Sequence, residues 1–233
     1  MALKCSIVVP TYNEEKYITD LLESVKRQTV APVEVILVDA SEDKTREIAA
    51  KYGAKVVNQE VRRVSWARKR GFEEAKGDII ISSDADTILA NDYVEQVTSE
   101  FESSEIAAVF GPVYLHDGPF PFGFFSRTLF SIFLRFSVLI RRPNLNGMNF
   151  ACSKKAYLKS GGFDPEMVTG EDVYLGAKLL KVGRVKYSSK VKVFTSARRI
   201  KGMGGWKFVW HHTKNFVRMA LGRKSSGDFE AFR

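Results

Sequence analysis

Residues 77–86 read GDIIISSDAD, an apolar run that follows Gly77 and ends in the carboxylates of Asp84 and Asp86. The run of isoleucines predicts a buried β-strand. Side chains two residues apart on an extended chain point the same way, so we expect the two carboxylates to converge on one spot. Carboxylate oxygens suit a hard divalent cation such as Mg²⁺ or Mn²⁺, although a solvated acidic loop has the same local composition. The surrounding motifs must decide between these interpretations.

Strands and helices alternate on the N-terminal side of this run. Apolar, strand-like segments lie at 6–10, 33–38 and 55–58. Three helices are expected: one that begins near residue 14, one from a cap at Ser41 to about residue 52, and one over 65–76. Such alternation predicts an α/β fold with a mostly parallel central sheet, flanked by helices, that binds its ligands beyond the carboxyl ends of the strands. Those ends carry polar residues at 11–14, at Asp39 and at 84–86.

Charge is distributed unevenly along the chain, whose formal net charge is +9. Residues 1–180 carry 22 Lys and Arg against 25 Asp and Glu, whereas residues 181–233 carry 14 against 2. This asymmetry indicates an anionic partner for the C-terminal part: a lipid surface, a diphosphate or a nucleic acid. A solvated basic tail is the alternative.

Residues 119–140 differ in composition from the rest of the chain, with seven phenylalanines and only Arg127 and Arg135 as charged residues. The two arginines and an early Pro/Gly cluster argue against a membrane-spanning helix. A helix that lies in the lipid headgroup region fits better. A core helix or a lid over the site fits the same composition.

The expected compartment is the cytoplasm, with peripheral attachment to the inner face of the cell membrane. The N-terminal residues lack the features of a secretory signal. Cys5 and Cys152 each lie in an apolar run and are expected to be reduced core residues rather than a disulfide.

Six motifs together resemble the family-2 glycosyltransferases of GT-A fold, which transfer a sugar from a nucleotide-sugar donor to an acceptor. In order, the motifs are SIVVPTYNE at 6–14, VDASEDKT at 38–45, ARKRG at 67–71, GDIIISSDAD at 77–86, GGFD at 161–164 and ED at 171–172. The resemblance spans most of the chain and implies a single Rossmann-like GT-A domain. It implies a nucleotide-sugar-binding half at 1–115, the apolar segment at 116–145, an acceptor-side half at 146–200, and a basic amphipathic helix and tail at 201–233.

The resemblance also implies the roles of individual residues. The residues expected to bind the donor are Pro10, Thr11, Tyr12, Glu14, Asp39, Arg68 and Asp84. Apart from the resemblance, Arg198 and Arg199 follow a strand-like run and are expected to add positive charge near the donor diphosphate; a plain surface position is the alternative. A Mn²⁺ or Mg²⁺ ion that bridges the donor diphosphate is expected on Asp86, with Asp84 sharing the metal or contacting the ribose. The second motif is one residue shorter than is common in the family, so UDP-linked and GDP-linked donors both remain open.

The expected chemistry is an inverting displacement, because a single positioned carboxylate removes the proton of the acceptor hydroxyl. The resemblance assigns this carboxylate to Asp172, and Glu171 is expected to hold the geometry or contact the acceptor. The metal assists departure of the nucleotide diphosphate. The acceptor is expected to be a membrane lipid, such as a polyprenyl phosphate or a glycolipid, and no nucleic-acid partner is expected.

Two other functions fit parts of the sequence. A sugar nucleotidyltransferase is expected to carry a glycine-rich loop near its N-terminus, and residues 10–14 lack one. A non-catalytic lipid- or nucleic-acid-binding protein on the same fold would explain the basic C-terminal part, but would not need the carboxylates of Asp84, Asp86, Glu171 and Asp172.

Overall fold

The computed structural model describes residues 3–118, 120–207, 209–210 and 213–214. Its strands are β1 (Cys5–Thr11), β2 (Glu34–Asp39), β3 (Lys55–Asn58), β4 (Ile79–Ser82), β5 (Thr87–Leu89), β6 (Ile106–Phe110), β7 (Val113–Leu115), β8 (Phe150–Ser153), β9 (Arg184–Tyr187) and β10 (Val193–Thr195). Its helices are α1 (Ile18–Lys26), α2 (Thr45–Lys51), α3 (Val64–Glu74), α4 (Tyr93–Glu100), α5 (Phe122–Arg127), α6 (Leu129–Leu139), α7 (Lys154–Lys159), α8 (Glu171–Leu179) and α9 (Arg198–Met203).

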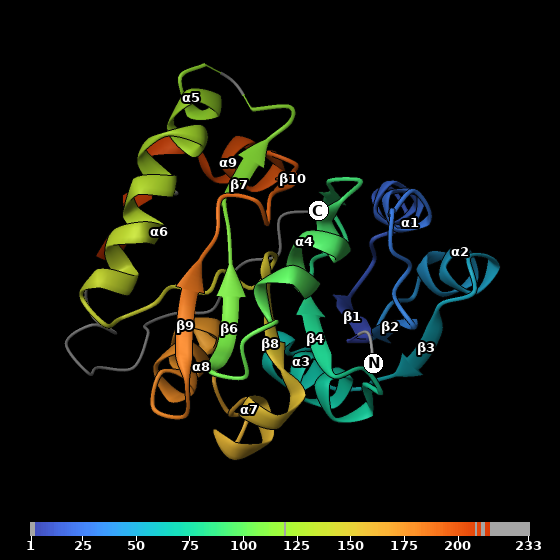
Figure 1. Ribbon diagram of the computed structural model, residues 1–233. Helices are drawn as coiled ribbons and strands as arrows, with labels where there is room; N and C mark the ends of the chain where they lie inside the picture. The colour runs from blue at the N-terminus through green and yellow to red at the C-terminus, as the bar shows by residue number, and fades with distance from the viewer. Residues whose placement is uncertain (1–2, 119, 208, 211–212, 215–233) are drawn as a thin grey trace.

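Among the described residues, the central sheet has seven strands in the order β3-β2-β1-β4-β8-β6-β9. Strand β1 pairs in parallel with both β2 and β4, whereas β8 is antiparallel to its two neighbours. Successive residues of β1 enter different cores, since Ile7 and Val9 belong to one apolar cluster and Val8 to the other. Strands buried on both faces in this way are typical of a sheet covered by helices on each side. The α/β prediction is confirmed (Figure 1).

A second sheet, in the order β5-β10-β7, was not predicted. The apolar residues 107–115 predict a single strand, but they form parts of two, because the chain leaves the central sheet after β6 and joins the second sheet at β7. Gly111 stands at this change of direction, where an added Cβ would lie 1.8 Å from the carbonyl oxygen of Val191. Only a residue without a Cβ allows the two backbones to pass at this separation.

The two aspartates that follow β4 lie in a turn rather than on a strand. Strand β4 ends at Ser82, and the amide of Thr87 donates to the carbonyl of Asp84 at 3.1 Å. The expectation that both carboxylates sit on one extended segment was therefore wrong. The chain turns here because β5 must separate from β4 to pair with β10.

Helices α5 and α6 lie at one edge of the molecule, beside β7 and β9 (Figure 1). Only Leu134 and Ser137 of α6 are buried, and α5 contributes no buried residue. Together, residues 122–139 are apolar and long enough to cross a membrane by length and composition alone. The basic amphipathic helix and tail predicted over 201–233 lie largely outside the described residues.

Candidate active site

The carboxyl ends of β1, β2 and β4 and the first turns of α8 and α9 bring most of the predicted site residues to one edge of the central sheet. They lie there because parallel neighbouring strands end at the same edge. The side chains that converge form one group around Asp39 and two arginine-centred groups, one around Arg68 and one around Arg198.

Asp39, the last residue of β2, is fully buried. Its carboxylate accepts hydrogen bonds from Thr11 Oγ1 at 2.6 Å and from the amide of Ser41 at 2.9 Å. It also accepts one from Nε of Arg46 at 2.5 Å, in a charge-assisted ion pair. These contacts fix the orientation of the side chain that was predicted to meet the nucleotide base.

A cavity of about 640 Å³ opens next to Asp39, and this size is within the range of small-molecule sites, roughly 300–1,000 Å³. Its lining residues come from the ends of β2 and β3 and from α2: Ala40, Ser41, Glu42, Asp43, Arg46, Glu47, Gln59, Glu60 and Arg62. The guanidinium of Arg62 lies 4.6 Å from the ring centroid of Tyr12. Pro10 is half-buried on β1, opposite Val38 of β2.

Arg68 joins two carboxylates in what we call the Arg68 bridge. Its guanidinium donates to Asp84 Oδ1 at 2.7 Å and forms a second ion pair with Glu171. All three side chains are nearly inaccessible to solvent. Burial raises the pKa of the Glu171 carboxyl, and the positive charge of Arg68 opposes that rise. For Arg68, burial acts to lower the pKa, but the negative charges of Asp84 and Glu171 outweigh it and the pKa is raised.

Arg198 joins a second pair of carboxylates, in what we call the Arg198 bridge. Its Nε donates to Asp86 Oδ2 at 2.7 Å, and its two terminal nitrogens donate to Glu14 at 2.7 and 2.9 Å. Its guanidinium also lies 4.4 Å from the ring centroid of Tyr17. Burial raises the pKa of Glu14 although Arg198 opposes that rise. The next residue, Arg199, lies 3.8 Å from Asp84 Oδ2 and connects the two bridges.

The predicted base, Asp172, lies in the first turn of α8 next to Glu171. Its Oδ2 accepts a hydrogen bond from the amide of Gly147 at 2.7 Å, and its Oδ1 accepts one from the amide of Val173 at 2.8 Å. Each carboxylate oxygen therefore keeps a lone pair for another donor. An added Cβ on Gly147 would lie 2.3 Å from the Arg68 guanidinium. The lack of a side chain therefore lets the backbone at Gly147 pass next to Arg68 while its amide donates to Asp172.

Asp86 has the side chain best suited to a divalent cation. Its Oδ1 is buried and accepts no hydrogen bond, whereas its Oδ2 is taken by Arg198. No group of three or more His, Cys, Asp or Glu side chains with metal-binding geometry occurs in the part of the chain that the structure describes. The unpartnered Asp86 oxygen fits Mg²⁺ or Mn²⁺, because Mg²⁺ typically takes one or two protein carboxylates and completes its shell with substrate phosphates and water.

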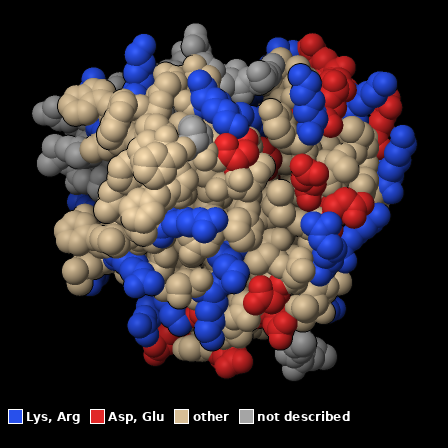
Figure 2. Space-filling model, turned by 90° about the horizontal axis from the view of Figure 1, so that it is seen from above, with Lys and Arg blue, Asp and Glu red and all other residues tan. Residues whose placement is uncertain are grey.

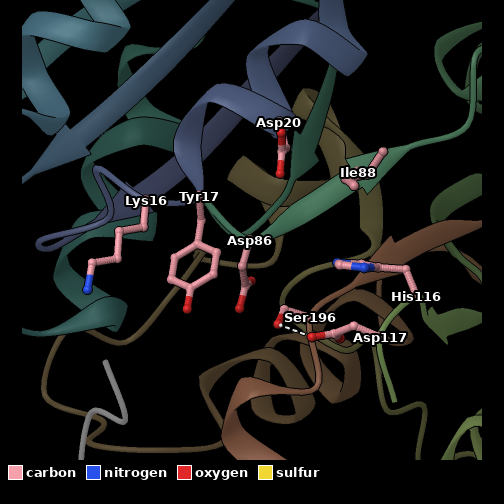
Figure 3. Close-up of a pocket in the computed structure, with 8 residues that line it drawn as sticks. All are labelled: Lys16, Tyr17, Asp20, Asp86, Ile88, His116, Asp117 and Ser196. Atoms are coloured by element: carbon pink, nitrogen blue, oxygen red, sulfur yellow. Dashed lines mark hydrogen bonds between the residues drawn. The ribbon is translucent and has the colours of Figure 1, made fainter. Parts of the chain in front are cut away.

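A smaller cavity of about 170 Å³ lies beside Asp86 (Figure 3). Its lining residues come from the start of α1 and the residues before it, from β5 and the residue before it, and from the segments after β7 and β10: Lys16, Tyr17, Asp20, Asp86, Ile88, His116, Asp117 and Ser196. In Figure 3, Tyr17 and Asp86 face Ser196, which donates to Asp117 at 3.2 Å. This volume is below the usual size of a small-molecule site.

Sequence reasoning missed Arg46, Gly147 and Asp117. Arg46 had a local signal, since it is a basic residue on the helix that directly follows Asp39. Gly147 and Asp117 had none, because their partners Asp172 and Ala197 are 25 and 80 residues away in the sequence.

Comparison with known proteins identifies the family of the chain. The model of glycosyl transferase family 2 matches residues 6–161. The putative glycosyltransferase EpsH of Bacillus subtilis is 38% identical over 98 residues, which are 40% of this chain and 28% of EpsH. The glucosyl-dolichyl phosphate glucuronosyltransferase of Haloferax volcanii is 32% identical over 123 residues, which are 49% of this chain and 39% of that protein. The chain thus spans well under half the length of these relatives.

The fold is shared with the mannosyltransferase PcManGT from Pyrobaculum calidifontis, whose structure is a complex with GDP-Man and Mn²⁺. The TM-score is 0.74 at 19% sequence identity, over 97% of this chain and 66% of that one. This likeness confirms the predicted GT-A fold. Because the family model covers more than half of its residues, the chain belongs to glycosyl transferase family 2.

Proposed function

We propose that the protein is a metal-dependent, inverting glycosyltransferase that moves a sugar from a UDP- or GDP-linked donor to a lipid-linked acceptor. The observation that carries the proposal is the edge of the sheet where the unpartnered Asp86 oxygen and the carboxylate of Asp172 lie near the buried Arg68 bridge. One carboxylate is suited to the donor metal and the other to the acceptor proton. The large cavity beside Asp39 is suited to the nucleoside.

Each group has a separate task in this mechanism. Asp39, Thr11 and Tyr12 hold the nucleoside end, and Asp86, with Asp84 nearby, would hold Mn²⁺ or Mg²⁺. When bound, the metal stabilises the negative charge on the departing diphosphate. Arg68 keeps Asp84 and Glu171 in fixed positions. Asp172 takes the proton from an acceptor hydroxyl while the hydroxyl oxygen attacks the anomeric carbon of the donor sugar. This direct attack expels the nucleotide diphosphate and inverts the configuration at that carbon.

Substitutions at Asp86 and Asp172 test this division of tasks. We expect Asp86→Ala to lose the Mn²⁺-dependent thermal stabilisation by nucleotide-sugars, since ligand bound to the native state raises its stability. We expect Asp172→Asn to keep that stabilisation and to lose transfer by roughly 10²–10⁴-fold. Asp78→Asn is the matched control, because this aspartate precedes β4 at the opposite end of the strand.

Two outcomes would contradict the proposal. Wild-type transfer to a hydroxyl acceptor by Asp172→Asn would remove this residue from the role of base. Failure of wild-type protein to bind any UDP- or GDP-sugar with Mn²⁺ would favour a non-catalytic lipid-binding protein.

An acceptor phosphate is already ionised near neutral pH, with a second pKa of about 6, so it needs no base to remove a proton. Retained transfer to a polyprenyl phosphate alone would therefore identify the phosphate as the attacking group.

An exposed apolar surface on α5 and α6 supports the lipid-linked acceptor and peripheral attachment to the inner face of the membrane. This surface, the apolar ridge, consists of Phe124, Leu129, Ile132, Phe136, Leu139 and Trp206, each with more than half of its side-chain surface exposed. Trp206 joins the ridge through its ring contact with Phe122, at a centroid distance of 5.8 Å. Ridge residues on α6 recur every three or four positions, so they share one face of the helix.

Exposed basic residues on or next to the helices of the ridge add positive charge suited to anionic lipids. They are Arg127 and Arg135 within α5 and α6, Arg141 and Arg142 just after α6, and Lys201 on α9. In Figure 2, tan side chains form a broad area with Lys and Arg residues at its margins. A helix with an apolar face and flanking cations binds in the interfacial plane of a bilayer. The name of the Haloferax volcanii relative, which includes a dolichyl phosphate substrate, supports the same class of acceptor.

Vesicle flotation tests the ridge. We expect wild-type protein to float with vesicles of phosphatidylcholine and phosphatidylglycerol, and the triple variant Ile132→Ser, Phe136→Ser, Leu139→Ser to remain unbound, because it loses the apolar area that enters the bilayer. Leu158→Ser is the control, since Leu158 is 61% exposed but lies on α7. Unchanged flotation of the triple variant would exclude the ridge as the membrane-binding surface.

A further inference from the structure

We propose that Arg198 is an exchangeable cation of the active site: without donor it neutralises Glu14 and Asp86, and it leaves Asp86 when a metal–nucleotide complex binds. The inference rests on the proposed function, because it concerns the site at which the donor metal would bind. It adds a positioning role for Asp117, which holds the segment that carries Arg198.

The first support is the geometry of the Arg198 bridge. Three different nitrogens of the guanidinium donate to carboxylate oxygens at 2.7–2.9 Å, and these carboxylates lie 184 and 112 residues away in the sequence. The Arg198 side chain is only 11% exposed. An arginine that satisfies two buried carboxylates in this way acts as their counter-cation, which is the role that a divalent ion would take.

The second support is the state of the Asp86 carboxylate. Oδ2 is bound to Arg198, whereas Oδ1 is buried and accepts no hydrogen bond. A metal on Oδ1 while Arg198 remained on Oδ2 would place two positive centres on one carboxylate, and such like charges repel strongly at a partly buried site. A metal that arrives with a diphosphate brings negative oxygens to which the guanidinium can transfer its hydrogen bonds. Metal alone should therefore bind weakly, and metal with nucleotide should bind well.

The third support is the weak anchoring of α9. This helix has six residues, none of them buried, and Arg198 is its first residue. Asp117, between β7 and α5, holds the start of α9: it accepts from the amide of Ala197 at 2.6 Å, from Ser196 Oγ at 3.2 Å and from Lys201 Nζ at 2.8 Å. Ala197, directly before α9, is buried, but α9 itself places no residue in the core. The helix that carries Arg198 can therefore shift at a smaller cost than one packed in the core.

Mn²⁺ binding to the full chain, measured by electron paramagnetic resonance of the free ion, tests the inference. We expect Arg198→Gln to bind Mn²⁺ without nucleotide more tightly than wild type, on the order of 10-fold, which is a typical coupling between two ligands. We expect added UDP or GDP to increase Mn²⁺ affinity strongly in wild type and much less in Arg198→Gln. Arg63→Gln is the matched control, because it removes an arginine whose exposed ion pair is with Glu166, outside both bridges.

Asp117→Asn should give a smaller gain in nucleotide-free Mn²⁺ affinity, and no further gain when combined with Arg198→Gln. A role for Asp117 in folding alone would lower the unfolding temperature and leave Mn²⁺ affinity unchanged, which would overturn its positioning role. Arg198→Lys keeps the charge without the bidentate fork, and should bind Mn²⁺ with an affinity between those of wild type and Arg198→Gln.

Equal nucleotide-free Mn²⁺ affinity in wild type and Arg198→Gln would overturn the inference while leaving the proposed function intact, provided that nucleotide still promotes Mn²⁺ binding. Absence of Mn²⁺ binding in every variant, with and without nucleotide, would contradict the metal site and with it the metal-dependent transfer. The two failures are therefore distinguishable in one set of titrations.

Discussion

The Arg68 bridge and the Arg198 bridge have the same composition, one arginine between two carboxylates, but they are held by different parts of the fold. Arg68 lies within α3, which packs on β1 so closely that an added Cβ on Gly71 would lie 2.3 Å from Val8. Arg198 begins a short helix that contributes no buried residue. An arginine on a helix packed into the core holds its carboxylates in fixed positions, whereas an arginine on a helix outside the core can exchange its partners.

The largest expected effect is at Arg68. Arg68→Met leaves Asp84 and Glu171 buried without their cation, and we expect it to lower the free energy of unfolding by about 3–5 kcal/mol. Urea denaturation measures this change. Arg63→Met is the control, because its pair with Glu166 is exposed and should change stability by no more than ~0.5 kcal/mol. Similar losses in both variants would contradict the structural role of the Arg68 bridge.

A smaller loss is expected at Arg198, and it should depend on metal. Arg198→Met removes the cation from Glu14 and Asp86. Because the Arg198 side chain is more exposed than that of Arg68, at 11% against 5%, and α9 contributes no buried residue, we expect a smaller loss of about 1–3 kcal/mol. Mn²⁺ with nucleotide should recover part of this loss, because a new cation neutralises Asp86. Urea denaturation of the variant with and without Mn²⁺ and UDP or GDP measures the recovery. The same recovery in Arg68→Met would remove the distinction between the two bridges.

The smallest effect is a dependence of stability on pH. Burial raises the pKa of Glu14 and of Glu171 above the ordinary value of 4.5, although an arginine opposes each rise. Between 4.5 and the raised values, the folded protein binds more protons than the unfolded chain. The free energy of unfolding therefore falls as pH rises through this window, by at most about 1.4 kcal/mol per pH unit for each proton.

Glutamine in place of either glutamate removes its share of this slope. We expect Glu14→Gln and Glu171→Gln each to show a flatter fall in stability above pH 4.5, measured by urea denaturation at a series of pH values. Glu105→Gln is the control, since Glu105 is exposed. A slope unchanged by either substitution would mean that these glutamates titrate alike in the folded and unfolded states.

Much of the fold followed from local patterns. The β-branched runs predicted β1, β2, β3 and β4, because strands buried on both faces need apolar residues at every position. The alternation of these runs with helices predicted a parallel sheet. The polar residues that follow the strands then had to meet at one edge, which is why Asp39, Asp84 and Asp86 could be assigned to one region of the molecule before any coordinates.

Other features had no local pattern. Residues 107–115 read as one strand, since nothing near them in the sequence announces that Val191 approaches the backbone at Gly111. The turn at Asp84 was missed for a similar reason, because β5 pairs with a strand more than 100 residues later. The partners of Arg198 are equally remote in the sequence, so the second ion-pair bridge could not be anticipated.

The sequence by itself determined the family, the α/β architecture and the set of carboxylates available for metal and base chemistry, because these depend on residue types and their local spacing. The tertiary structure decided which cation each carboxylate meets. Asp84 meets Arg68, and Asp86 meets Arg198, although both aspartates belong to the same short motif. The physical reason is that an ion pair forms only where the packing of distant elements brings two charges together, and a turn of a few residues separates the two carboxylates into different surroundings.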